Sequence, residues 1–147
     1  LPCLTAFIPM LMDTGGNSGS QACVSIIRGI SLNEIEFRDL GRVVWKEIRV
    51  SVLCGVCLAV ACFAKIIVVD MLLLKSESVT YLVAFVVCAT MAVTVCLAKI
   101  VGSTLPLLAK KLGFDPAVMA SPIITTIVDF LSLLVYFAFA TAILGIG

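Results

Sequence analysis

Hydrophobic residues run through this chain in four long stretches, at about residues 1–30, 44–69, 79–110 and 116–145. Short charged or turn-forming segments separate them. Each stretch is long enough to cross the hydrocarbon core of a bilayer, which takes about 20 helical residues. The pattern predicts an all-α membrane protein in which four transmembrane helices form a bundle.

The segment between the first two stretches, residues 31–43, mixes charged and apolar side chains. This mixture favours a short interfacial helix, with Asn33 as its N-cap. Lys and Arg are concentrated in the connections 28–49 and 110–116, which are therefore expected on the cytoplasmic side. In the second of these connections, Gly113 follows two lysines and predicts the end of a helix.

Composition supports one domain over residues 1–147, embedded in the lipid bilayer as a multi-pass protein of the plasma membrane. The chain is 62% hydrophobic and only 13% charged, and its mean hydropathy is +1.24. A net charge of +1 without a basic patch argues against nucleic acid as a partner. There is no histidine, and no nucleophile–base pair or cofactor motif is evident, so we do not expect an enzyme.

A run of small and polar residues, 13–21, interrupts the first apolar stretch. On a helix, Thr14, Asn17 and Gln21 share one face, whereas Gly15 and Gly19 form a small-xxx-small pair on an adjacent face. Polar groups at membrane depth must face protein or water. Two interpretations remain open: the run lines an ion path, or its amides only bond neighbouring helices together.

The last apolar stretch carries a second polar stripe, made of Ser121, Thr125, Asp129, Ser132 and Tyr136. Asp129 is the only charge of that stretch. An ionised carboxylate alone in lipid costs at least about 2.5 kcal/mol, so Asp129 needs a cationic partner or a wet cavity. One candidate partner is Lys99, because both residues lie about 15 positions from the intervening turn and would share a depth in an antiparallel hairpin.

The other candidate partner of Asp129 is a metal ion. Mg²⁺ keeps most of its waters and needs one or two carboxylates with neutral oxygens around it, whereas zinc prefers His or Cys. A symmetric dimer would place two copies of Asp129 around one axis. One carboxylate per chain beside hydroxyls and amides therefore suits hydrated Mg²⁺.

These residues resemble the membrane domain of the MgtE magnesium channels over nearly the whole chain. The resemblance is carried by Pro9, by the motif 13–21 with Ile27 and Arg28, and later by residues 112–117, Pro122 and 126–129. It implies a homodimer with five membrane helices per protomer and a pore on the two-fold axis, lined by the first and last stretches. It also implies that Asp129 binds Mg²⁺ at the centre, that Asn17 is a pore-lining amide, and that Asp115 binds Mg²⁺ at the cytoplasmic mouth.

The chain departs from the family in several respects. The family's first membrane helix and its cytosolic sensor and CBS domains are expected to be missing from this sequence. Ser121 stands where an Asn is expected, and Ser132 where a Gly is expected. These two differences concern selectivity and pore width.

Three functions compete at this point. In a magnesium channel, Asp129 attracts the ion beside a wall formed by Thr14, Gly15, Gly16, Asn17, Gln21, Ser121, Thr125 and Ser132. In a cation antiporter, Asp129 alternates between a proton, Lys99 and a metal. In a purely structural membrane subunit, the polar stripes only join helices. Asp13 has no assigned role.

Overall fold

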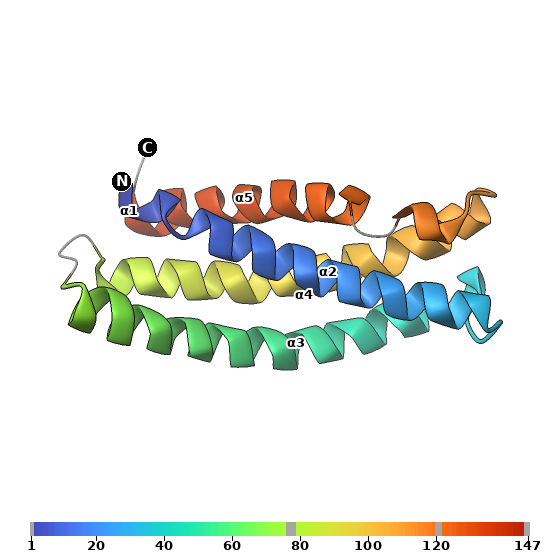
Figure 1. Cartoon of the computed structure of the whole chain (residues 1–147), viewed down its shortest axis with the longest axis horizontal. Coiled ribbons are helices and arrows are strands. Elements are labelled where there is room, and N and C mark those ends of the chain that lie inside the picture. Colours follow the sequence, from blue (N-terminus) through green and yellow to red (C-terminus); the bar gives the residue numbers. More distant parts are fainter. Residues whose placement is uncertain (1, 76–78, 120–121, 146–147) are drawn as a thin grey trace.

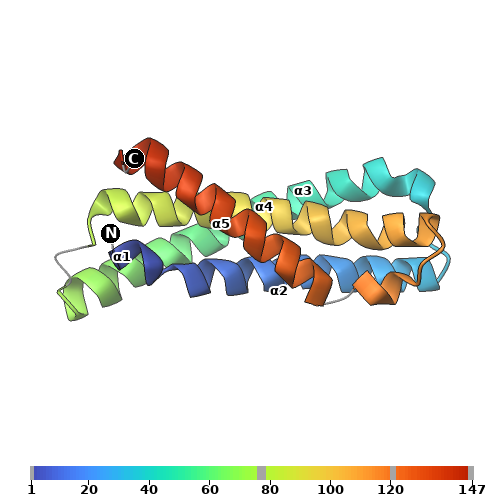
Figure 2. The ribbon, with the colours of Figure 1, turned by 90° about the horizontal axis from the view of Figure 1, so that it is seen from above.

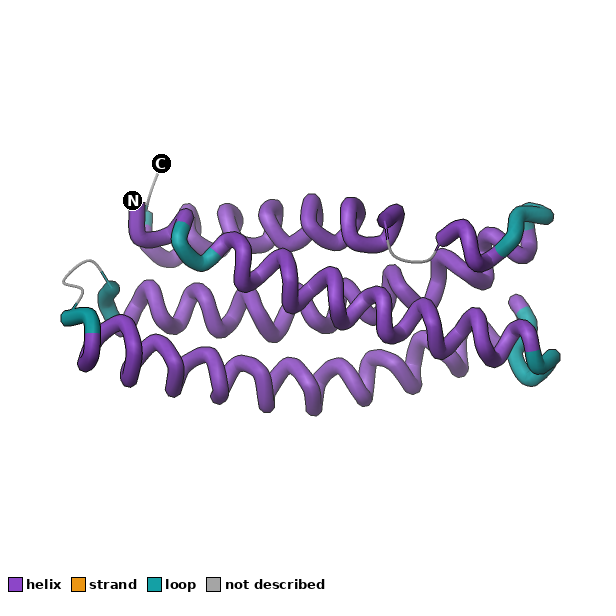
Figure 3. Tube along the Cα trace, viewed as in Figure 1, coloured by secondary structure: helices purple, strands orange, loops and turns teal. Residues whose placement is uncertain are grey.

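The computed structural model describes residues 2–75, 79–119 and 122–145, which form a bundle of long helices with connections at its two ends (Figures 1 and 3). In chain order the elements are α1 (Pro2–Thr5), α2 (Ile8–Ser31), the 3-10 helix η1 (Phe37–Asp39), α3 (Leu40–Lys65), the π-helix η2 (Ile66–Leu73), α4 (Tyr81–Lys111), the 3-10 helix η3 (Pro116–Met119) and α5 (Pro122–Leu144). No strand occurs within the described ranges, and the predicted all-helical class is confirmed.

Three segments of the described chain are long and apolar enough to cross a membrane: Phe37–Leu73, Tyr81–Lys111 and Pro116–Leu144. The 24-residue helix α2 runs alongside them (Figure 1). It carries the polar residues of the 13–21 motif, and these lower its mean hydropathy. Its crossing of the membrane, and with it the count of four spans, stays a prediction.

The predicted interfacial helix over residues 31–43 is not confirmed, because this segment holds the end of α2, the short 3-10 helix η1 and the start of α3. Helix α2 ends at Ser31, and Asn33 adopts a left-handed backbone with φ 55° instead of capping a new helix. The next helical turn begins at Phe37 and continues directly into α3. The charged residues from Arg38 onward therefore belong to the start of a span. Gly113, with φ 83°, follows the end of α4 as predicted.

Helix α4 is the centre of the bundle, because α2, α3 and α5 all pack against it (Figures 1 and 2). Helix α5 crosses α2 and α4 obliquely in Figure 2. At the contact of α2 with α4, a Cβ built on Gly102 would overlap the backbone carbonyl of Gly19. Small residues thus allow close backbone approach, as is common between membrane helices.

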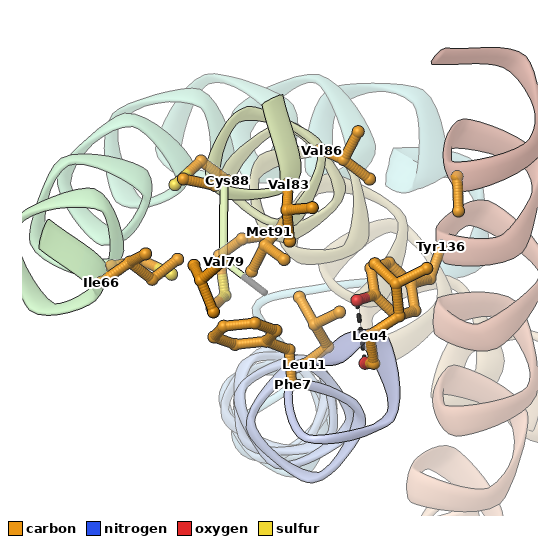
Figure 4. Packing of buried hydrophobic residues seen from close by; sticks show 14 residues of the cluster. Leu4, Phe7, Leu11, Ile66, Val79, Val83, Val86, Cys88, Met91 and Tyr136 are labelled. Atoms are coloured by element: carbon orange, nitrogen blue, oxygen red, sulfur yellow. Dashed lines mark hydrogen bonds between the residues drawn. The ribbon is translucent and has the colours of Figure 1, made fainter. Parts of the chain in front are cut away.

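The largest apolar core joins the start of α2 and α4 to the ends of α3 and α5 (Figure 4). Tyr136 is fully buried there, and its hydroxyl donates a hydrogen bond of 2.9 Å to the carbonyl of Leu4. This bond ties α5 to α1. The core therefore fixes how α5 lies against the helix that carries the 13–21 motif.

Candidate cation pathway

A cavity of about 160 Å³ lies between α2 and α5. It is lined by Met12, Asp13, Gly16, Asn17, Thr125 and Asp129. Helical spacing explains the set, because residues three or four positions apart share a helix face. The two polar motifs of the sequence, about a hundred residues apart, thus supply facing walls of one cavity.

Gly16 allows α2 to approach the polar stripe of α5. A Cβ at this position would lie 3.2 Å from the Thr125 side chain and 3.9 Å from Oδ1 of Asp129. A larger side chain would occupy the space in front of both residues. The missing side chain therefore keeps the cavity open.

Hydrogen bonds inside each helix orient the polar groups of this cavity. The amide nitrogen of Asn17 donates to Oδ2 of Asp13 at 3.1 Å. The hydroxyl of Thr125 donates to the carbonyl of Pro122 at 3.1 Å. Asp13, to which the sequence assigned no role, shares the cavity with Asp129, so two carboxylates face the same space.

A second, larger cavity of about 670 Å³ follows the surface of α2. It is lined by Asn17, Ser20, Gln21, Val24 and Ser25. Asn17 belongs to both cavities. A track of polar side chains therefore runs along α2 from Asp13, which shares the first cavity with Asp129, to Gln21.

Three of the predicted wall residues lie away from these two cavities. Ser132 is 1% exposed, and its hydroxyl donates to the carbonyl of Val128 at 2.6 Å. A Cβ built on Gly15 would meet the side chains of Thr94, Val128 and Ser132, so Gly15 packs inside the bundle. Thr14 is half-buried and lines neither cavity.

Lys99, one of the two candidate partners of Asp129, pairs with another residue in the structure. Nζ of Lys99 lies 3.7 Å from Oε2 of Glu47, and both side chains are buried between α3 and α4. Ala98, the neighbour of Lys99, faces Gly19 on α2 instead. Lys99 therefore points to the α3 side of α4, whereas Asp129 faces α2.

The two other predicted site residues belong to the region before α5. Asp115 is exposed, and its Oδ1 accepts a hydrogen bond of 2.9 Å from the backbone N–H of Ala117 at the start of η3. Ser121 lies outside the described residues. No group of three or more His, Cys, Asp or Glu side chains that could hold a metal ion is found in the described part of the chain.

Comparison with known proteins gives the family. A family model described as "MgtE: Divalent cation transporter" matches residues 8–139. The chain belongs to the MgtE family. It is 34% identical over 139 residues to the magnesium transporter MgtE of Bacillus subtilis, 33% identical over 141 residues to that of Thermus thermophilus, and 32% identical over 138 residues to that of Enterococcus faecalis.

These alignments cover 94–96% of this chain but 29% of each relative. The chain thus spans less than a third of the length of the curated MgtE relatives it matches. The matched range holds both walls of the cavity. Members of the MgtE family are transporters and not enzymes, and three apolar helices fit a multi-pass location in the plasma membrane.

Two features of the region escaped sequence reasoning. Glu47 lies near the start of the second apolar stretch, 44–69, where an acid could have been considered as a partner for Lys99. The close contact between Gly102 and Gly19 could not be predicted from the sequence, because a lone glycine in an apolar run has no distinctive spacing. Both are contacts between different helices.

Proposed function

We propose that this chain is the membrane part of a magnesium channel, in which hydrated Mg²⁺ passes between two copies of the chain and is held by Asp129. The observation that carries the proposal is the cavity in which the carboxylates of Asp13 and Asp129 meet the amide of Asn17. The names of the relatives support the choice of ion, since three of them are magnesium transporters.

The chemistry of the cavity suits an ion that keeps its water. Its volume of about 160 Å³ has room for several water molecules at about 30 Å³ each. Carboxylate, amide and hydroxyl oxygens accept hydrogen bonds from coordinated water, and Mg²⁺ dehydrates reluctantly. Asp129 supplies charge, while Asn17 and Thr125 supply neutral acceptors.

Exposed polar residues on α2 support a pore between two copies. Asp13, Asn17 and Gln21 are all exposed in the single chain and follow one another at four-residue intervals. At membrane depth such side chains need protein or water beside them. A symmetric partner that faces α2 and α5 would enclose a wet path and bring two copies of Asp129 to one axis.

The remaining assignments extend the path toward the end of the bundle where α2 ends and η3 begins (Figure 1). Gln21 continues it along α2, and Asp115 binds Mg²⁺ at the cytoplasmic mouth. Thr14 and Ser121 remain predicted wall residues, whereas Gly15 and Ser132 are better explained by packing between helices.

The central test is ion flux through the full chain reconstituted in liposomes. Asp129→Ala is expected to lower Mg²⁺ influx at least about tenfold, since a hydrogen bond to a charged group contributes about 1.5–3 kcal/mol. Thr126→Val is the matched control. Thr126 directly follows the cavity residue Thr125 but does not line the cavity, and its hydroxyl donates to the carbonyl of Pro122. Unchanged influx in Asp129→Ala, with normal thermal unfolding, would contradict the proposal.

The antiporter alternative needs a contact between Lys99 and Asp129 that does not fit the position of Lys99. It requires exchange between Lys99 and Asp129, and the ion-pair partner of Lys99 is Glu47 on α3. A purely structural subunit predicts no flux in liposomes at all. The same experiment therefore separates that alternative from a channel.

A further inference from the structure

The hydrogen bond between Asn17 and Asp13 determines which end of the Asn17 amide is available to an ion. Asn17 Nδ2 donates to Asp13 Oδ2 at 3.1 Å across one turn of α2. An amide has one oxygen acceptor and one NH₂ donor group. If the amide were reversed, its oxygen would face a carboxylate oxygen, and neither atom can donate.

Hydrated Mg²⁺ needs a wall of acceptors. Water bound to a cation presents its hydrogens outward, so an NH₂ group turned toward it would repel it. The neighbouring hydroxyls follow the same pattern, because Thr125 donates to the carbonyl of Pro122 and Ser25 donates to the carbonyl of Gln21. The side-chain donors of Asn17, Thr125 and Ser25 each thus have an acceptor within the helix that carries them.

We propose that Asp13 is a positioning residue, which holds the amide of Asn17 so that its oxygen, not its nitrogen, faces the hydrated cation. This inference rests on the proposed magnesium-channel function. Asp13 acts through Asn17 here and does not need to touch the ion. The identity of the residue one turn before the amide therefore sets the affinity for a hydrated divalent cation.

A double-mutant cycle tests this role. Mg²⁺ influx and Mg²⁺ binding are measured for the full chain and for Asp13→Ala, Asn17→Ala and the double variant. Asp13→Ala alone is expected to raise KM and the Mg²⁺ dissociation constant roughly two- to tenfold, as for one lost hydrogen bond, with little change in the maximal rate. In the Asn17→Ala background, the same change is expected to have almost no effect.

The outcomes separate a positioning role from the alternatives. Equal fold-changes in both backgrounds would show that Asp13 acts by its own charge, and would overturn the proposal. An unchanged KM in Asp13→Ala would overturn it as well. Absence of Mg²⁺ influx in the unsubstituted chain would instead refute the proposed function. Ser31→Ala is the control, because it removes an exposed hydroxyl on the same helix that donates to the carbonyl of Ile27 and lines neither cavity, and it is expected to leave both values unchanged.

Discussion

At the scale of single residues, the cavity depends on the missing side chain of Gly16 as much as on the polar side chains that line it. Gly16 has no side chain, and the space in front of it is where Thr125 and Asp129 lie. The acids and the amide can face a hydrated ion only while this space stays open. Residue size at position 16 should therefore limit conduction directly.

Gly16→Val is expected to reduce Mg²⁺ influx roughly tenfold and to lower the free energy of unfolding by about 1–3 kcal/mol, as for other overpacked positions. Liposome flux and thermal unfolding measure the two effects. Gly41→Val is the control, because a Cβ on Gly41 meets nothing within 4 Å. Full influx in Gly16→Val would show that this wall does not border the path.

At the scale of elements, α4 supports the helices that form the cavity. Its Gly102 side touches α2, while Lys99 reaches Glu47 on α3. A buried ion pair contributes little net stability, but loss of one partner leaves an uncompensated charge. The pair joins α3 to α4, and we expect it to contribute to helix packing and not directly to conduction.

Lys99→Met is expected to lower the free energy of unfolding by about 3–5 kcal/mol, because Glu47 would remain buried and unpaired. The double variant Lys99→Met with Glu47→Leu should recover most of this loss and should retain Mg²⁺ influx. Chemical unfolding in detergent and liposome flux test both statements. A double variant that is stable but conducts no Mg²⁺ would give the ion pair a role in transport.

At the scale of the whole molecule, the polar side of α2 and α5 is open in the single chain. In the pore that we propose, a second copy of the chain would close this side, and conduction would need Asp129 from both copies. A pore shared by two copies and two independent paths, one in each copy, predict different Mg²⁺ influx when unsubstituted and substituted chains are mixed.

Co-reconstitution of equal amounts of unsubstituted chain and Asp129→Ala is therefore expected to give about a quarter of the full Mg²⁺ influx, since random pairing in a symmetric dimer leaves that share of intact pairs. Independent paths in each chain would give about half. Flux normalised to total protein distinguishes the two values. A Thr126→Val mixture is the control and should retain full influx.

The sequence by itself determined the helical class, the positions of the long helices and the residues that carry polar chemistry, because apolar length and helical spacing are local properties. Tertiary structure decided which of those residues meet. It brought Asp13 beside Asp129, paired Lys99 with Glu47, and buried Ser132 behind Gly15. These choices depend on how each helix is rotated about its own axis and crosses its neighbours, and spacing within one helix contains no information on either.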